Sequence, residues 1–104
     1  MTVFIGHESA LAILRSIASH GEAPPPLARL SLLDVTAREV SAGLSGCPRE
    51  AFVQGKAHVL VPSHAARSKH RDCVNHIWSH EVIPGSFWAL GDGIYVSSPE
   101  FLFL

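Results

Sequence analysis

The chain has 104 residues, of which 47% are hydrophobic and 16% charged, and its formal net charge is −1 at pH 7. This length fits one domain with a single core, and the balanced charge argues against a nucleic-acid-binding surface spread over the whole domain. No apolar run approaches the roughly 18 residues that a membrane span requires. The two cysteines, Cys47 and Cys73, are expected to be free thiols of a cytoplasmic protein.

The first quarter of the chain contains a predicted strand, a helix and a rigid connector. Residues 2–5 form a β-branched and aromatic run that predicts a short strand. Apolar residues recur at three- and four-residue spacing from Glu8 to Ser19, which predicts a helix that ends with Gly21 in the left-handed conformation. Pro24–Pro26 predicts an extended connector, because proline is excluded from helix interiors.

The middle of the chain predicts a second, shorter helix. Residues 29–33 are consistent with a strand or with an extended approach to this helix. Asp34 or Thr36 could provide its N-cap, and the helix would continue to Ala42 before the glycines that follow. Residues 47–55 are rich in turn-forming residues and predict an irregular passage.

The second half of the chain carries the predicted strands. Ala57–Val61 has the clearest strand pattern, and the next candidate is Cys73–Ser79. The polar residues 63–71 between them are predicted to form a loop of a hairpin. A second hairpin is predicted over 86–96, because Asp92-Gly93 lies between two apolar runs and suits a tight turn with positive φ.

The last residues predict the first turn of another helix. Ser98 fits an N-cap and Pro99 fits the first helical position. Phe101–Leu104 would then begin a buried helix, so we expect a fragment of a longer protein that continues after Leu104. The order of elements predicts one α+β domain over residues 1–104, in which two or three helices cover one side of a mostly antiparallel sheet of three to five strands.

Four potential zinc ligands lie within a short stretch of the chain. His70, Cys73, His76 and His80 are all residue types that bind zinc. In a strand, however, Cys73 points to the face opposite His76, and His76 and His80 would be about 13 Å apart. Ordinary half-buried histidines are therefore the favoured interpretation, with no metal or other cofactor predicted, and a small zinc-binding module is the alternative.

The region from His58 to His80 contains five of the seven histidines and has a net charge of +2. Its basic side chains, Arg67, Lys69 and Arg71, could contact phosphate groups of a nucleic acid, although a solvated loop is the favoured interpretation. No nucleophile elbow or cluster of carboxylates accompanies them. We therefore predict no catalytic residues and expect the chain not to be an enzyme.

Aromatic residues provide the candidate interface anchors. Average soluble domains contain about 25% charged residues, so the low charged fraction predicts that a protein partner or a second copy covers part of the surface. Trp78, Trp88, Phe101 and Phe103 could anchor such an interface if they are exposed together. Packing within the core and across strands is the alternative for these side chains.

Several short motifs occur in the order found in one bacterial family. These are Ser9-Ala10-Leu11, His58-Val59-Leu60-Val61-Pro62, the basic residues 67–71, the histidine-bearing residues 74–76, and Gly93-Ile94-Tyr95-Val96-Ser97-Ser98-Pro99. With them, the chain resembles the region that follows the N-terminal winged helix in AbiEi-type antitoxins and related transcriptional regulators.

This resemblance implies a central, non-catalytic domain that takes part in toxin neutralisation or in contacts with a partner. The DNA-binding winged helix of the family would precede Met1, so DNA binding is not implied for these residues. The alternative is an accessory domain of a nucleic-acid-processing enzyme whose catalytic part lies downstream.

Overall fold

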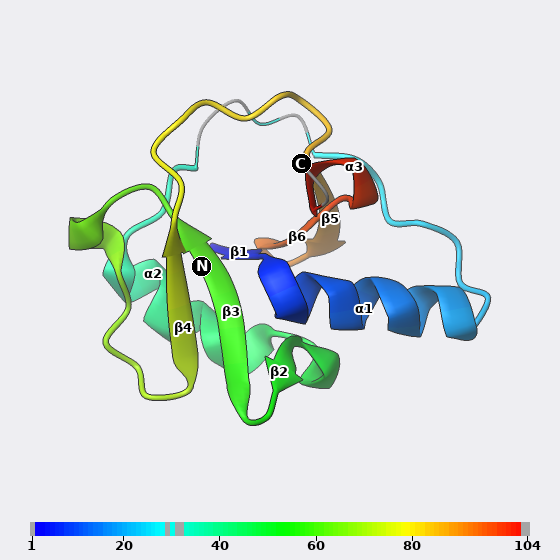
Figure 1. The fold of residues 1–104 in the computed structure, drawn as a ribbon, viewed down its shortest axis with the longest axis horizontal. Coiled ribbons are helices and arrows are strands. Elements are labelled where there is room, and N and C mark those ends of the chain that lie inside the picture. Colours follow the sequence, from blue (N-terminus) through cyan, green and yellow to red (C-terminus); the bar gives the residue numbers. More distant parts are fainter. Residues whose placement is uncertain (1, 29, 31–32, 103–104) are drawn as a thin grey trace.

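The computed structural model describes residues 2–28, 30 and 33–102 (Figure 1). Within these residues the fold is α+β, as predicted, with six strands in one mixed sheet and three α-helices. Short 3₁₀ turns follow α2 and interrupt the loops. The strands are β1 (Val3–Ile5), β2 (Phe52–Val53), β3 (Lys56–Val61), β4 (Cys73–Ile77), β5 (Phe87–Gly91) and β6 (Ile94–Ser97), and the helices are α1 (His7–Ser19), α2 (Ala37–Gly43) and α3 (Pro99–Leu102).

The sheet is larger and less antiparallel than predicted. β1 lies between β3, to which it is antiparallel, and β6, to which it is parallel. β3 also pairs with β4 in parallel, so the predicted hairpin between these two strands is wrong. The physical reason is the length of the connection. Residues 62–72, with a 3₁₀ turn at His64–Ala66, are enough to return the chain from the end of β3 to the end of the sheet where β3 begins, so that β4 runs in the same direction.

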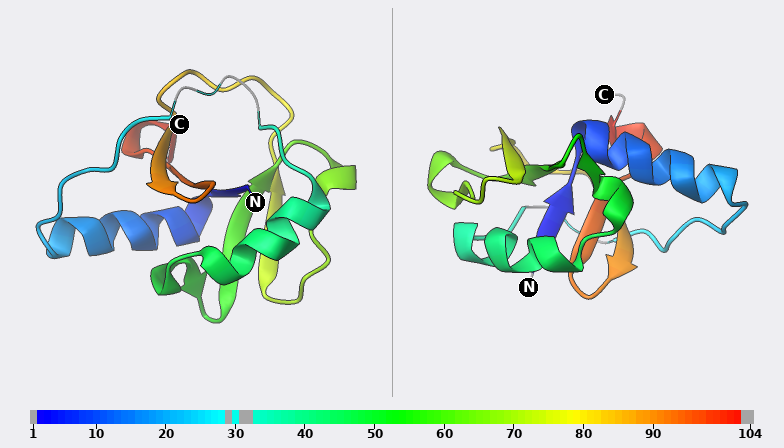
Figure 2. Two further views of the ribbon diagram at one scale, coloured as in Figure 1. Left: turned by 180° about the vertical axis from the view of Figure 1, so that it is seen from behind. Right: turned by 90° about the horizontal axis from the view of Figure 1, so that it is seen from below.

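The helices cover both faces of the sheet, whereas the sequence predicted one covered face. Figure 2 shows α1 and α2 on opposite sides of β3 and β1. The burial of β1 agrees with this arrangement, because Val3, Phe4 and Ile5 are all at most 2% exposed. A strand buried on both faces has a continuous apolar sequence rather than an alternating one.

The predicted turns and caps are confirmed. Asp92 and Gly93 have φ values of 53° and 78°, as the tight turn between β5 and β6 requires. Gly21 has a φ of 66° just after α1. Of the two candidate caps of α2, Thr36 is the one used, and the Ser98 hydroxyl accepts a hydrogen bond from Phe101 N at 3.5 Å.

Other boundaries differ from the predictions. The turn-rich residues 47–55 contain the short strand β2, which pairs with the start of β3. β4 ends at Ile77 instead of Ser79. The strand considered for residues 29–33 falls partly on Arg29, Ser31 and Leu32, which lie outside the described residues, while Leu30 and Leu33 have no regular secondary structure.

A row of aromatic side chains, which we call the aromatic row, crosses the core and connects β1, β5, β6 and α3. Phe4 of β1 contacts Tyr95 of β6 and Phe87 of β5, each at a ring-centroid distance of 5.2 Å. Phe87 in turn contacts Phe101 of α3 at 5.2 Å, and Phe101 contacts Trp78, which follows β4, at 5.1 Å. These spacings are typical of favourable aromatic pairs.

Candidate functional site

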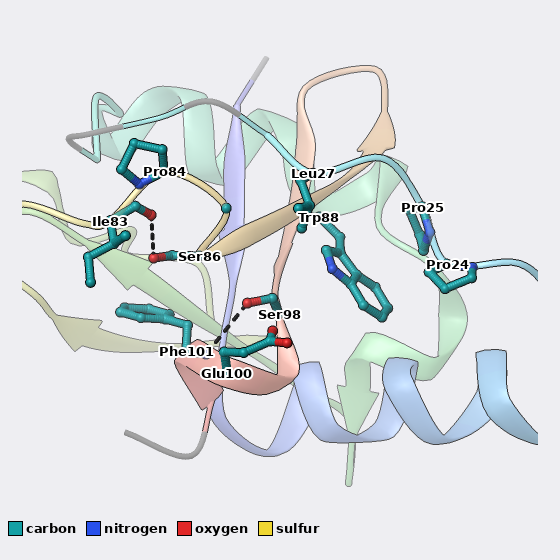
Figure 3. A pocket seen from close by; sticks show the side chains of 11 residues that line it. Pro24, Pro25, Leu27, Ile83, Pro84, Ser86, Trp88, Ser98, Glu100 and Phe101 are labelled. Carbon is teal, nitrogen blue, oxygen red and sulfur yellow. Dashed lines mark hydrogen bonds between the residues drawn. The ribbon is translucent and has the colours of Figure 1, made fainter.

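A groove of about 560 Å³ opens beside Trp88 (Figure 3). We call it the Trp88 groove. Its walls come from the proline-rich segment after α1, from the loop before β5, from β5 itself and from the start of α3. Two large apolar side chains on its walls are exposed to solvent, Leu27 at 60% and Ile83 at 73%. The lining residues are Pro24, Pro25, Leu27, Ile83, Pro84, Gly85, Ser86, Trp88, Ser98, Glu100 and Phe101.

Main-chain hydrogen bonds hold the proline-rich wall against the edge of β5. Ala28 N donates to Phe87 O and Ala89 N donates to Pro26 O, both at 2.8 Å. Leu27 and Trp88 are thereby paired across an isolated antiparallel bridge. Because proline has no N–H, this segment pairs with β5 through few bonds and presents mainly its rings and side chains to the groove.

The polar side chains in the groove are largely engaged within the fold. The Ser86 hydroxyl donates to Ile83 O at 2.5 Å, and the Ser98 hydroxyl accepts from the main chain of α3. Of the described residues that line the groove, Glu100 is the one with a charged side chain, and it is exposed. The groove is therefore an apolar surface with one carboxylate at its rim.

A second groove of about 400 Å³ adjoins the first and shares Pro25 with it. Ile13 and Ile17 of α1 form part of its apolar wall, together with Leu90 of β5. Its charged lining residues are again carboxylates, Glu22 and Glu50. Within the described residues, neither of these glutamates nor Glu100 forms an ion pair.

A separate feature, the histidine cluster, lies where α1 begins and consists of His7, His58 and His76. The rings of His7 and His76 are stacked at a centroid distance of 3.7 Å. Nδ1 of His58 lies 2.9 Å from Nε2 of His76. Glu8 approaches the cluster from α1, with its Oε2 3.8 Å from Nε2 of His58.

The local backbone brings these side chains together. Gly6 allows the start of α1 to approach β3, because a Cβ at this position would lie 2.9 Å from Cγ of Leu60. Beside it, the Ser9 hydroxyl accepts a hydrogen bond from His58 N at 2.7 Å. His7 has a φ of 51°, in the left-handed region that non-glycine residues seldom occupy.

Burial and mutual proximity oppose protonation of two members of the histidine cluster, His7 and His76. Burial is the largest cause that lowers the pKa of His76 to about 4, followed by its proximity to His7 and His58. Burial also lowers the pKa of His7, as does the proximity of His58. Glu8 partly offsets both shifts.

The donor atoms of the histidine cluster form a chain rather than a ring. Glu8 faces one ring nitrogen of His58 and His76 faces the other, so the atoms do not surround a common point. Across the described part of the chain, no group of three or more histidine, cysteine or acidic side chains is arranged to hold a metal ion.

The four zinc-ligand candidates have different surroundings in the structure. His70 Nδ1 accepts a hydrogen bond from Asp72 N at 3.1 Å, and Cys73 Sγ points to Asn75 Oδ1 at 3.8 Å. His76 belongs to the histidine cluster, while the ring of His80 lies roughly perpendicular to that of Trp78. Burial raises the pKa of the Cys73 thiol, and that of Cys47 to about 11; both cysteines are free.

The connection between β3 and β4, residues 62–72, is called the crossover loop. Its three basic side chains do not share one hollow. Arg67 and Lys69 line a depression of about 290 Å³ together with Ser68 and Asn75. Arg71 lies outside it and approaches Asp72, with 4.0 Å between Nε and Oδ1. All three cations are exposed.

The predicted interface residues divide between the groove and the core. Trp88 and Phe101 both line the Trp88 groove, whereas Trp78 packs in the aromatic row. Phe103 lies outside the described residues. Leu27 and Ile83 were not predicted from the sequence, because their high exposure next to prolines follows from their loop positions and not from any repeated pattern.

Comparisons with known proteins identify no family for this chain. No family model matches the chain, and no curated protein or solved structure is significantly similar to it. In the described part of the chain, no helix has both the length and the apolar character needed to cross a bilayer.

Sequence reasoning also missed the histidine cluster. His58 is separated from His76 by 18 positions and from Ser9 by 49. The available signal was a histidine in each of two strand-like runs. Whether His58 and His76 lie side by side depends on the strand pairing, and they meet because β3 and β4 are parallel with Leu60 opposite His76.

Proposed function

We propose that this chain is a non-catalytic binding domain of a bacterial cytoplasmic protein, and that the Trp88 groove receives an apolar segment of a protein partner. The observation that carries the proposal is the exposure of Leu27 and Ile83 in a groove that Trp88 also lines. Exposed apolar surface of this kind, rimmed by polar residues, is typical of interaction sites. A large aromatic side chain such as Trp88 in an exposed apolar surface is a typical interface anchor.

The chemistry of the groove also favours binding over catalysis. Its two hydroxyl groups, on Ser86 and Ser98, already bond to the main chain. No histidine is among the described lining residues that could serve either hydroxyl as a base. The groove therefore offers shape and apolar contact without an activated nucleophile.

The resemblance to AbiEi-type antitoxins supports a role in toxin neutralisation or partner contact. Its motifs fall on the elements that build the domain: Ser9-Ala10-Leu11 lies in α1, and His58–Val61 lies in β3. Gly93–Pro99 spans the turn, β6 and the start of α3, next to the Trp88 groove. In this proposal the partner is a protein that the domain holds or restrains.

The charges around the grooves indicate which partner segment would bind. Among the described residues that line the two adjoining grooves, the charged ones are Glu22, Glu50 and Glu100. Complementary charge favours correct encounter and orientation more than raw affinity. We therefore infer that the partner segment is apolar and carries lysine or arginine at its flanks.

The experiment selects peptides from a random displayed library on the wild-type chain and measures the affinity of each selected peptide by fluorescence anisotropy. We expect apolar peptides with basic flanks. Ile83→Glu places a carboxylate under the bound apolar side chains, and we expect it to weaken binding by about tenfold or more.

Ile77→Glu is the matched control, because Ile77 is an exposed isoleucine at the end of β4 and does not line the groove. This variant should bind the selected peptides like the wild type. Equal affinities of the wild type and Ile83→Glu, or a library that yields no peptide sensitive to Ile83→Glu, would contradict the proposed function.

A further inference from the structure

The histidine cluster joins three elements of the fold, and its contacts limit how many of its ring nitrogens can be protonated at once. His7 belongs to α1, His58 to β3 and His76 to β4. Nδ1 of His58 and Nε2 of His76 face each other at 2.9 Å, so one of these two atoms must lack a proton for the hydrogen bond to exist. A proton on both atoms would replace this bond by repulsion.

The stacked pair in the cluster imposes a second limit. The rings of His7 and His76 are 3.7 Å apart. Two positive charges at about this distance repel each other strongly, particularly where burial weakens the screening by water. The positive φ of His7 adds to this sensitivity, because the stacking contact helps to hold a backbone conformation that is itself unfavourable.

One nearby carboxylate offsets part of this repulsion. Glu8 is the acidic group that faces the cluster, 3.8 Å from Nε2 of His58, and its side chain is 69% exposed. The N-terminal end of α1 acts in the opposite direction, because the helix dipole places partial positive charge there. The surroundings therefore compensate one positive charge on the cluster, but not two.

We propose that the histidine cluster is a proton-sensitive latch, which fastens the first turn of α1 to β3 and β4 while its three imidazoles together carry at most one positive charge, and releases that turn when they take up a second. This inference is independent of the Trp88 groove and of the proposed function. It concerns a regulatory device in the fold: the attachment of α1 becomes weaker as the solution becomes more acidic.

The direction of the pH effect agrees with the lowered pKa values. His76 has a pKa of about 4 in the folded chain and an ordinary value of 6.5. As the pH falls below 6.5, the unfolded chain therefore takes up a proton that the folded chain does not. The stability contributed by neutral His76 is fully present above pH 6.5 and is lost between pH 6.5 and about 4.

The first test measures urea unfolding of the wild type, His76→Phe and His64→Asn between pH 7.5 and 5. Each imidazole kept neutral by the fold can raise the wild-type unfolding equilibrium constant by up to about tenfold per unit decrease in pH. We expect His76→Phe to show a shallower pH dependence, because phenylalanine retains a ring against His7 and cannot titrate.

His64→Asn is the matched control, because His64 is an exposed histidine of the crossover loop, outside the cluster. It should keep the wild-type pH dependence. Equal pH dependence of the wild type and His76→Phe would overturn the proposal.

A second test needs only the wild-type chain and remains decisive if His76→Phe does not fold. NMR would follow the imidazole signals and the exchange rate of the His58 amide, which bonds to Ser9 in α1. We expect His76 to remain neutral at pH 5.5, and we expect the protection of the His58 amide to fall as the cluster takes up protons. An ordinary midpoint for His76, or protection that is unchanged through its titration, would overturn the latch.

Discussion

Ser9 shows how much one side chain can contribute to the position of a helix. It is fully buried in the second position after His7, and its hydroxyl accepts the main-chain N–H of His58 at 2.7 Å. Donors buried in this way nearly always have a partner in native proteins. The bond therefore gives the main-chain N–H of His58 in β3 an acceptor and at the same time fixes the start of α1.

We predict that Ser9→Ala lowers the free energy of unfolding by about 1–3 kcal/mol, because it leaves the N–H of His58 without its acceptor. Urea unfolding monitored by circular dichroism measures the loss. Ser19→Ala is the control, since Ser19 is exposed and bonds within its own helix. A loss at Ser9 no larger than that at Ser19 would show that the buried bond has little net value.

Individual residues were predictable where their role is local. Asp92 and Gly93 could be assigned to a turn from their immediate neighbours. His58 and His76 could not be assigned to one cluster, because their proximity depends on how two strands align. The histidines were expected to be half-buried polar residues, and nothing in their spacing predicted that His7 would stack on one of them.

The short helix α2 depends on its N-terminal cap. The Thr36 hydroxyl accepts from Glu39 N at 3.2 Å, and Glu39 Oε1 accepts from Thr36 N at 3.1 Å. This reciprocal pair is a capping box, which satisfies two main-chain donors at once. A helix of seven residues gains little from its own propagation, so the cap contributes a large share of its stability.

Thr36→Ala should therefore destabilise the domain by about 0.5–2 kcal/mol. Thr36→Ser keeps the hydroxyl acceptor and should recover most of this loss. Thermal unfolding of the three chains tests the prediction, which fails if serine and alanine have the same effect.

Elements were predicted better than their partners. The strand in residues 57–61, the hairpin around Asp92 and the cap at Ser98 each follow from a few adjacent residues. Parallel pairing of β3 and β4 does not, because either direction is compatible with the same alternation of side chains along each strand. The strand β2 was missed because two residues are too few to show a period.

At the scale of the whole molecule, the aromatic row connects the two halves of the sheet. Phe101 lies between Trp78, which follows β4, and Phe87 of β5. Through Phe87 it reaches Phe4 at the centre of the sheet. The C-terminal helix thus bridges segments from opposite edges of the sheet.

Phe101→Ala should lower the free energy of unfolding by about 2 kcal/mol, because the side chain is only partly buried but contacts two aromatic rings. Leu27→Ala should change it by about 0.5 kcal/mol or less, since Leu27 is largely exposed in the same groove. Chemical unfolding of both variants tests this contrast. Similar losses would mean that the aromatic row is not the main contact of α3.

The sequence was sufficient for the α+β class but not for the arrangement of its layers. Helices followed by strands suggested a sheet covered on one side, whereas α1 and α2 lie on opposite faces. The fully apolar run Val3–Ile5 was the available indication of a strand buried on both faces, but so short a run is also compatible with other placements. The Trp88 groove combines segments distant in sequence, so only its individual aromatic residues could be anticipated.

The parallel alignment of β1 with β6 has a consequence for how the protein is made. Val3 lies opposite Ile94, so β1 is synthesised well before the strand that becomes its neighbour on that side. Until translation has passed Ser97, the fully apolar strand β1 can pair with β3 on one side only, and its other edge stays open. Such an edge readily joins other chains, and a ribosome that stalls before Ile94 would release a product prone to aggregate.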